Sequence, residues 1–166
     1  MQIQNSYCMY KKEFEIRWSD VDANGHLANS AYVNFMSHTR VGFLNKNGFS
    51  LKELVANGLG PVMFSEQIYY FKESFLGQKI YVTLEVSGLS EDGMFFTFEH
   101  NFYNEKGQHL ATCDMMGAWI NLKTRQLSEL PDHLKVLMGE FPKTETFKVL
   151  TKEDTRASGK RPKNLS

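Results

Sequence analysis

The residues from Asp20 to Asn29 form the densest group of reactive side chains in the sequence. They read Asp-Val-Asp-Ala-Asn-Gly-His-Leu-Ala-Asn and include two carboxylates, one imidazole and two carboxamides. A carboxylate can attack a carbonyl carbon or activate a water molecule against it. The first N–H groups of a helix, which have no carbonyl partner, can polarise the carbonyl oxygen. If a helix begins near Asn29, this stretch contains both parts of an acyl-transfer site.

A purely structural role explains the same stretch. Asn24 and Gly25 are typical of a tight turn, and Asp22 or Asn29 can cap the start of a helix. Gly25 also suits a backbone position with positive φ. His26 fits a hydrogen-bonding role better than that of a triad base, because the sequence has no G-x-S-x-G motif. The turn and the chemistry are compatible, so both interpretations remain open.

A calcium-binding loop is a third interpretation. The first part of an EF-hand loop is matched by Asp20, Asp22, Asn24 and Gly25. The twelfth position, where a bidentate Glu should stand, is Ala31. The residues before the loop alternate like a strand, whereas an EF-hand needs a helix there. We therefore expect no metal site in this stretch.

A strand and a long helix are predicted on either side of these residues. Apolar and charged residues alternate over 12–18, which is the period of a half-buried strand. Over 32–43 the apolar residues recur at helical spacing, and Asn47-Gly48 is suited to end the helix. Asn29 or Ser30 can cap its start. The reactive stretch is thus predicted to connect a strand to a helix.

The rest of the chain is predicted to be mainly strands. After a short helix over 50–56, segments rich in β-branched and aromatic residues predict strands over 63–74, 79–87, 94–103 and 109–122. A further short helix is predicted from Pro131 to Leu137. Because neither the long helix nor the sheet can bury its apolar face alone, these elements predict one α+β domain in which the sheet covers the helix.

Composition excludes several classes of protein. Nineteen basic residues balance nineteen acidic ones, so no overall field attracts nucleic acid or an anionic membrane. Cys8 and Cys113 do not have the spacing of a zinc site or a disulfide framework. No apolar run has the length of a signal peptide or a membrane span, which predicts a cytoplasmic protein.

The stretch from Arg17 to Leu27, followed by Asn29, Tyr32, Phe35 and Arg40, resembles the hotdog-fold acyl-CoA thioesterases of the 4-hydroxybenzoyl-CoA thioesterase-like family. Their pattern is R-x-x-D-x-D-x-x-G-H-[VL]-x-N-x-x-Y-x-x-[YF]. The resemblance implies a long central helix wrapped by a five- or six-stranded antiparallel sheet. It also implies a homodimer or homotetramer with its active site at a subunit interface. We expect the hotdog domain over 1–142 and a polar, partly disordered C-terminal extension over 143–166.

The resemblance also implies roles for individual residues. The substrate would be an acyl thioester of coenzyme A or of an acyl-carrier protein, with no cofactor other than the coenzyme A of the substrate. Asp22 would be the nucleophile or general base, and the backbone N–H near Asn29 would hold the thioester oxygen. Gly25 and His26 would shape the loop between them. The residues expected to contact substrate are Tyr32, Phe35, Tyr69, Phe71 and Lys72, although aromatic residues of this kind also commonly fill a core.

Two positions differ from the family pattern. Ala28 stands where the family often has Asn, and Ser37 stands where it often has Glu on the helix. No Asp or Glu occurs from Asn29 to Lys46, so Asp20 and Asp22 are the local candidates for the catalytic carboxylate. These differences leave an alternative open, in which the chain is a non-catalytic hotdog module that binds acyl thioesters.

Overall fold

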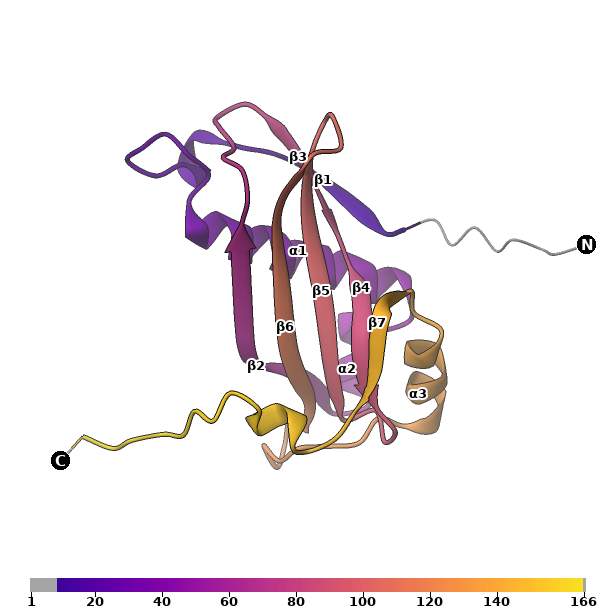
Figure 1. The fold of residues 1–166 in the computed structure, drawn as a ribbon. Coiled ribbons are helices and arrows are strands. Elements are labelled where there is room, and N and C mark those ends of the chain that lie inside the picture. Colours follow the sequence, from indigo (N-terminus) through magenta and orange to yellow (C-terminus); the bar gives the residue numbers. More distant parts are fainter. Residues whose placement is uncertain (1–8, 166) are drawn as a thin grey trace, which may run out of the picture.

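The computed structural model describes residues 9–165, so residues 1–8, including Cys8, and residue 166 lie outside the described residues. One sheet of seven strands packs against a long helix, α1, which crosses behind the sheet in Figure 1. In chain order the helices and strands are β1 (Lys11–Glu15), α1 (Asn29–Lys46), α2 (Leu51–Ala56), β2 (Leu59–Tyr70), β3 (Lys79–Thr83), β4 (Glu85–Ser90), β5 (Phe95–Asn104), β6 (His109–Asn121), α3 (Asp132–Gly139) and β7 (Lys143–Leu150).

The sheet has a branched order. β2 pairs with β6, and β6 pairs with β5. The other side of β5 pairs with β3 at one end and with β4 at the other. β3 also pairs with β1, and β4 also pairs with β7. All of these pairs are antiparallel except β4 with β7. Within the described chain β2 pairs on one side only, so it forms an edge of the sheet.

The core lies between α1 and the sheet. The buried face of α1 consists of residues three or four positions apart, which is the spacing that places side chains on one side of a helix. Phe35, Met36 and Phe43 are among them and pack with sheet residues such as Ile80 and Phe98 in one cluster. Full burial of an apolar side chain of this size contributes about 1.5–3 kcal/mol. The core therefore fixes α1, and the loop before it, against the sheet.

The predicted α+β arrangement, with a long helix covered by a mainly antiparallel sheet, is confirmed. The sheet has seven strands, whereas five or six were predicted. One difference is that the predicted strand over 79–87 is two strands, β3 and β4, which pair with different halves of β5.

The other difference is β7, which lies in the region expected to be a polar, partly disordered extension. Its residues pair in parallel with β4, including Lys148 with Gly88 and Val149 with Leu89. The hydropathy pattern did not indicate this strand because Leu150 is its one buried residue and the others are exposed or half-buried. Backbone hydrogen bonds join it to the sheet, and they do not require apolar side chains. Residues 143–150 are thus part of the sheet.

Membrane insertion through a helix finds no support in the described part of the chain. No helix within residues 9–165 combines the length and the apolar character that a bilayer crossing requires.

Gly117 lies where β2, β5 and β6 are in close contact. A Cβ atom at this position would stand 2.6 Å from the carbonyl oxygen of Val62 and 2.8 Å from the ring of Phe96. We expect Gly117→Ala to lower the free energy of unfolding by about 2–3 kcal/mol, because the strands must separate to admit the methyl group. Chemical denaturation measures this change. Gly139→Ala is the matched control, since a Cβ there meets nothing within 4 Å. Equal effects of the two substitutions would contradict the prediction.

His100 on β5 predicts a pH dependence of stability. It is completely buried, and neither ring nitrogen has a hydrogen-bond partner among residues 9–165. Burial, together with the charge of Arg40, holds the pKa of His100 well below its ordinary value of 6.5. The unfolded chain therefore binds a proton that the folded chain does not bind, so stability falls as the pH drops below about 6.5.

The expected loss of stability between pH 6.5 and pH 5.5 is about 1 kcal/mol from this residue. Urea titrations at both pH values measure it. In His100→Met this component should disappear, because the variant has no imidazole to protonate in the unfolded state. If the variant lost as much stability as the original protein over this pH range, His100 would not be its source.

Candidate active site

Asp22 lies in a tight loop between β1 and α1. The loop is closed by a backbone hydrogen bond from Asp22 N to His26 O of 2.8 Å, and Gly25 adopts a positive φ of 73°. The Asp22 Oδ1 atom accepts hydrogen bonds from the backbone N–H of Asn24 at 2.8 Å and of His26 at 3.2 Å. Within residues 9–165 the second oxygen, Oδ2, accepts none. The turn thus holds an exposed carboxylate in one orientation and leaves one oxygen open.

Asp20 has a different environment. It is buried, and its carboxylate accepts hydrogen bonds from the Nε atom of Arg17 at 2.9 Å and from its Nη2 atom at 3.1 Å. The side-chain hydrogen bond from Arg17 is the main reason that the pKa of Asp20 lies below its ordinary value. The carboxylate of Asp20 is thus bound by Arg17, whereas Asp22 lies on the exposed turn. Asp22 remains the carboxylate available for chemistry.

The start of α1 has no side-chain cap. The N-cap residue is Ala28, and neither Asn29 nor Ser30, the residues expected to cap the helix, occupies that position. Sequence reasoning missed this because Ala is a poor N-cap residue. By contrast, α2 is capped by Ser50, whose Oγ accepts the N–H of Glu53. In the first turn of α1 the N–H of Ala31 donates to the Ala28 carbonyl oxygen at 2.9 Å. The N–H groups of Asn29 and Ser30 precede the first carbonyl that the helix can offer, so they can bind a ligand oxygen.

A cavity of about 340 Å³, called here the main cavity, adjoins this helix start. It is lined by Asp22, His26, Leu27, Asn29, Tyr32 and the segment 70–74. Tyr32 is buried, which raises the pKa of its phenol, and its ring meets that of Tyr70 edge to face at 5.1 Å. The cavity therefore places the open carboxylate of Asp22 and the uncapped end of α1 beside the same space.

Most of the predicted site residues reach the main cavity. Asp22, His26 and Asn29 line it, and so do the predicted substrate-binding residues Tyr32, Phe71 and Lys72. Gly25 forms the turn beside it. Two predicted residues lie elsewhere, because Phe35 stacks on Phe14 in the groove between β1 and α1, and Tyr69 is exposed on β2 and is absent from the lining.

The segment 70–75 was only partly recognised from the sequence. It leaves β2 and is bound to the loop by a hydrogen bond from Leu27 N to Ser74 O of 2.8 Å and by a bridge between His26 and Phe75. The His26 ring lies 3.5 Å from the Glu73 carboxylate and meets the Phe75 ring at a centroid distance of 5.2 Å. Tyr70, Glu73 and Ser74 thus join the site through a long-range contact for which the sequence has no local signal.

A second cavity, called here the apolar cavity, lies beside the middle of α1. It has a volume of about 210 Å³ and is lined mainly by apolar residues of α1, β2, β5 and β6, including Val41, Met63 and Trp119. Arg40, at its border, pairs with Glu66 at 3.4 Å and donates to the Ser37 hydroxyl at 3.1 Å. The position where the family often has Glu is therefore occupied by a serine that binds Arg40.

Comparisons with known proteins identify relatives of this fold. Residues 16–137 match the profile of a family described as the thioesterase-like superfamily, whereas no curated protein matches the chain. The Staphylococcus aureus protein SAV2348, solved in complex with CoA, is 20% identical over 95% of this chain and 96% of that chain, with a TM-score of 0.74.

Two further solved structures have the same fold. Slr0204 from Synechocystis, a 1,4-dihydroxy-2-naphthoyl-CoA thioesterase, is 17% identical over 80% of this chain and 96% of that chain, with a TM-score of 0.69. YbaW from Escherichia coli, named a probable thioesterase, is 22% identical over 78% of this chain and 96% of that chain, with a TM-score of 0.68. The predicted hotdog fold is confirmed by these neighbours.

Proposed function

The chain belongs to the thioesterase-like superfamily, and on this premise we propose that it hydrolyses acyl thioesters in the main cavity. The observation that carries the proposal is the joint position of Asp22 and the first turn of α1 on one cavity. A carboxylate with one open oxygen and an uncapped helix start are the two groups that thioester hydrolysis needs.

In the proposed reaction the thioester oxygen accepts hydrogen bonds from the first N–H groups of α1. Asp22 acts on the carbonyl carbon, either by direct attack or by removing a proton from a water molecule that attacks. The carbon–sulfur bond then breaks, and the thiolate leaves. In the general-base route the thiolate takes up the proton that Asp22 removed from water. In the direct route water hydrolyses the anhydride formed between the acyl group and Asp22, which restores the carboxylate and supplies the proton that the thiolate takes up. The helix start stabilises the negative charge that develops on the oxygen, where the positive end of the helix dipole acts most strongly. No cofactor beyond the coenzyme A of the substrate enters these steps.

A panel of thioesters tests the proposal. Acyl and aroyl thioesters of coenzyme A and of acyl-carrier protein are mixed with the protein, and thiol release is followed with a thiol-reactive dye. We expect release from at least one member, unchanged by a metal chelator. Tight binding of acyl thioesters without release from any of them would instead support the non-catalytic binding module, which Ala28 and Ser37 keep as the second candidate.

We also propose that the active form is a homodimer joined along β2. This strand is an edge of the sheet, and its apolar residues Met63, Phe64, Tyr69 and Tyr70 are between 43% and 53% exposed. An exposed apolar edge strand is suited to pair with a second copy. Antiparallel pairing of two β2 strands would bring the Tyr70 end of one, beside its main cavity, to the Met63 end of the other, beside its apolar cavity. The acyl group would then extend from one subunit into the other.

The dimer predicts the behaviour of a charged variant. We expect Phe64→Glu to shift the mass in solution to that of a monomer and to lower activity at least about tenfold, because the charge cannot be buried against a second copy. Sedimentation at several concentrations measures the mass. Val136→Glu is the matched control, since Val136 is an exposed apolar residue on α3. An unchanged mass for Phe64→Glu would contradict pairing along β2.

A further inference from the structure

The apolar cavity contains hydrogen-bond donors but no carboxylate. Its volume of about 210 Å³ equals that of roughly seven water molecules in the liquid, so it can hold an acyl segment of several carbon atoms. The polar side chains in its wall are those of Ser37, Arg40 and Trp119, and no Asp or Glu of the described residues lines it. The buried indole N–H of Trp119 has no acceptor within residues 9–165. The wall therefore favours a ligand that carries an acceptor oxygen.

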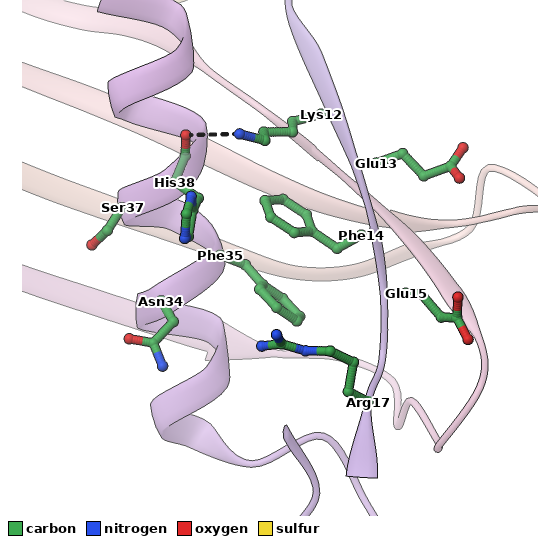
Figure 2. A pocket seen from close by; sticks show the side chains of 9 residues that line it. All are labelled: Lys12, Glu13, Phe14, Glu15, Arg17, Asn34, Phe35, Ser37 and His38. Carbon is green, nitrogen blue, oxygen red and sulfur yellow. Dashed lines mark hydrogen bonds between the residues drawn. The ribbon is translucent and has the colours of Figure 1, made fainter. Parts of the chain in front are cut away.

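Ser37 and Arg40 stand one turn apart on the side of α1 that faces β2. Figure 2 shows the Ser37 side chain pointing away from Phe14 and Phe35, which lie between α1 and β1. Arg40 donates from Nη2 to the Ser37 hydroxyl oxygen at 3.1 Å and from Nη1 to the Glu66 carboxylate at 3.4 Å. A guanidinium has five N–H groups, and Ser37 accepts without using its own hydroxyl hydrogen. Both side chains thus retain donors for a ligand oxygen.

The positive charge of Arg40 is only partly compensated within the described chain. The Arg40 side chain is 11% exposed, and its 3.4 Å contact with Glu66 is long for a hydrogen bond between charged groups. Burial lowers the pKa of Arg40 below its ordinary value of 12.5, and the opposing effect of Glu66 is smaller. A second anion beside the guanidinium would therefore stabilise its charged form. A carboxylate suits this position, because it can accept from the planar guanidinium and from the Ser37 hydroxyl together.

We propose that the apolar cavity selects acyl groups that end in a carboxylate, with the carbon chain against the apolar wall and the carboxylate at Ser37 and Arg40. The inference rests on the proposed function and narrows its substrates to ω-carboxyacyl thioesters, which are monothioesters of dicarboxylic acids. In the dimer proposed above, the acyl group reaches this cavity from the main cavity of the other subunit. The thioester carbonyl stays at the main cavity, so Ser37 and Arg40 determine specificity and take no part in the bond changes.

Binding of pantetheine thioethers tests the cavity without any hydrolysis. Pantetheine is the arm that coenzyme A and acyl-carrier protein share, and its sulfur is alkylated with chains of increasing length that end in a carboxylate or in a methyl group. At the optimal length we expect calorimetry to show about tenfold tighter binding of the carboxylate-ended thioether, because charge-assisted contacts are gained.

Ser37→Glu should abolish this preference, because the new carboxylate binds Arg40 and repels that of the ligand. Asn45→Glu is the matched control, since it adds the same charge to α1 at an exposed residue that does not line the cavity. The preference should be retained there. Ser37→Ala is a second variant that adds no charge, and the loss of its hydroxyl donor should lower the preference about threefold.

Hydrolysis provides a second measurement. The ratio of kcat/KM for an ω-carboxyacyl thioester to that for the methyl-ended thioester of equal length should fall about tenfold in Ser37→Glu and be retained in Asn45→Glu. Absence of binding, equal affinity of the two thioethers at every length, or equal effects of the two Glu substitutions would overturn the assignment even if acyl thioesters were hydrolysed. A carboxylate preference that depends on Ser37, together with no hydrolysis of any thioester, would support the cavity assignment and contradict the proposed function.

Discussion

Asp22→Asn is expected to lower kcat for acyl thioesters at least about a hundredfold, which corresponds to nearly 3 kcal/mol of transition-state stabilisation. The amide cannot attack the thioester as a carboxylate does, and it cannot take a proton from water. The fold should remain, because the Asn side-chain oxygen can still accept the N–H groups that Asp22 Oδ1 accepts from Asn24 and His26. Thiol release and the thermal midpoint are measured on the same preparation.

Asp20→Asn is the control for a general effect of losing a carboxylate from this loop. It removes the charge that pairs with Arg17 at 2.9 Å, so we expect the thermal midpoint to fall. The activity of the folded fraction should stay within about tenfold of the original, because Asp20 does not line the main cavity. If Asp22→Asn were as active as the original protein, Asp22 would not be the catalytic carboxylate.

Asn29→Pro is expected to lower kcat about 10²–10³-fold, which is the usual effect of losing one donor that stabilises an oxyanion. Proline has no N–H, so the substitution deletes the first donor of α1. The helix should tolerate it because Asn29 is the first residue of α1, a position where proline is common. Ala28 already has φ −66° and ψ 146°, a conformation that suits a residue before proline.

Asn29→Ala separates the backbone from the side chain. It keeps the N–H and removes the carboxamide, so we expect kcat within about tenfold of the original. Circular dichroism checks that the helix content of both variants is unchanged. If Asn29→Ala were as slow as Asn29→Pro, the side chain would carry the effect. If neither variant were slow, the helix start would not stabilise the thioester oxygen.

The central part of this site was predictable from the sequence because its residues are close together in the chain. Asp22, Gly25, His26 and Asn29 lie within eight positions, and the strand and helix around them have clear periods of two and of 3.6 residues. Local chemistry specifies such a turn. The residues alone left both Asp20 and Asp22 as candidate carboxylates, and the family resemblance selected Asp22. The sequence did not predict that Arg17 binds Asp20, because that contact depends on the folded loop.

Predictions that required long-range contacts were less complete. Phe35 was expected to contact substrate. It does not line the main cavity and stacks on Phe14, because the packing of β1 against α1 decides which way that face of the helix points. Tyr70, Glu73 and Ser74 reach the main cavity because the segment after β2 is bound to the loop that precedes α1. The predicted strand over 79–87 is divided because β5 pairs with its two halves separately.

The sequence by itself determined the order of elements, the long helix and the reactive loop before it, since each depends on side chains a few positions apart. Only the tertiary structure decided that Asp20 is buried, that α1 starts without a cap and that β7 belongs to the sheet. It also decided that a groove lies between β1 and α1. These features depend on burial, backbone pairing and strand register between distant segments, and backbone hydrogen bonds have the same chemistry whichever side chains accompany them.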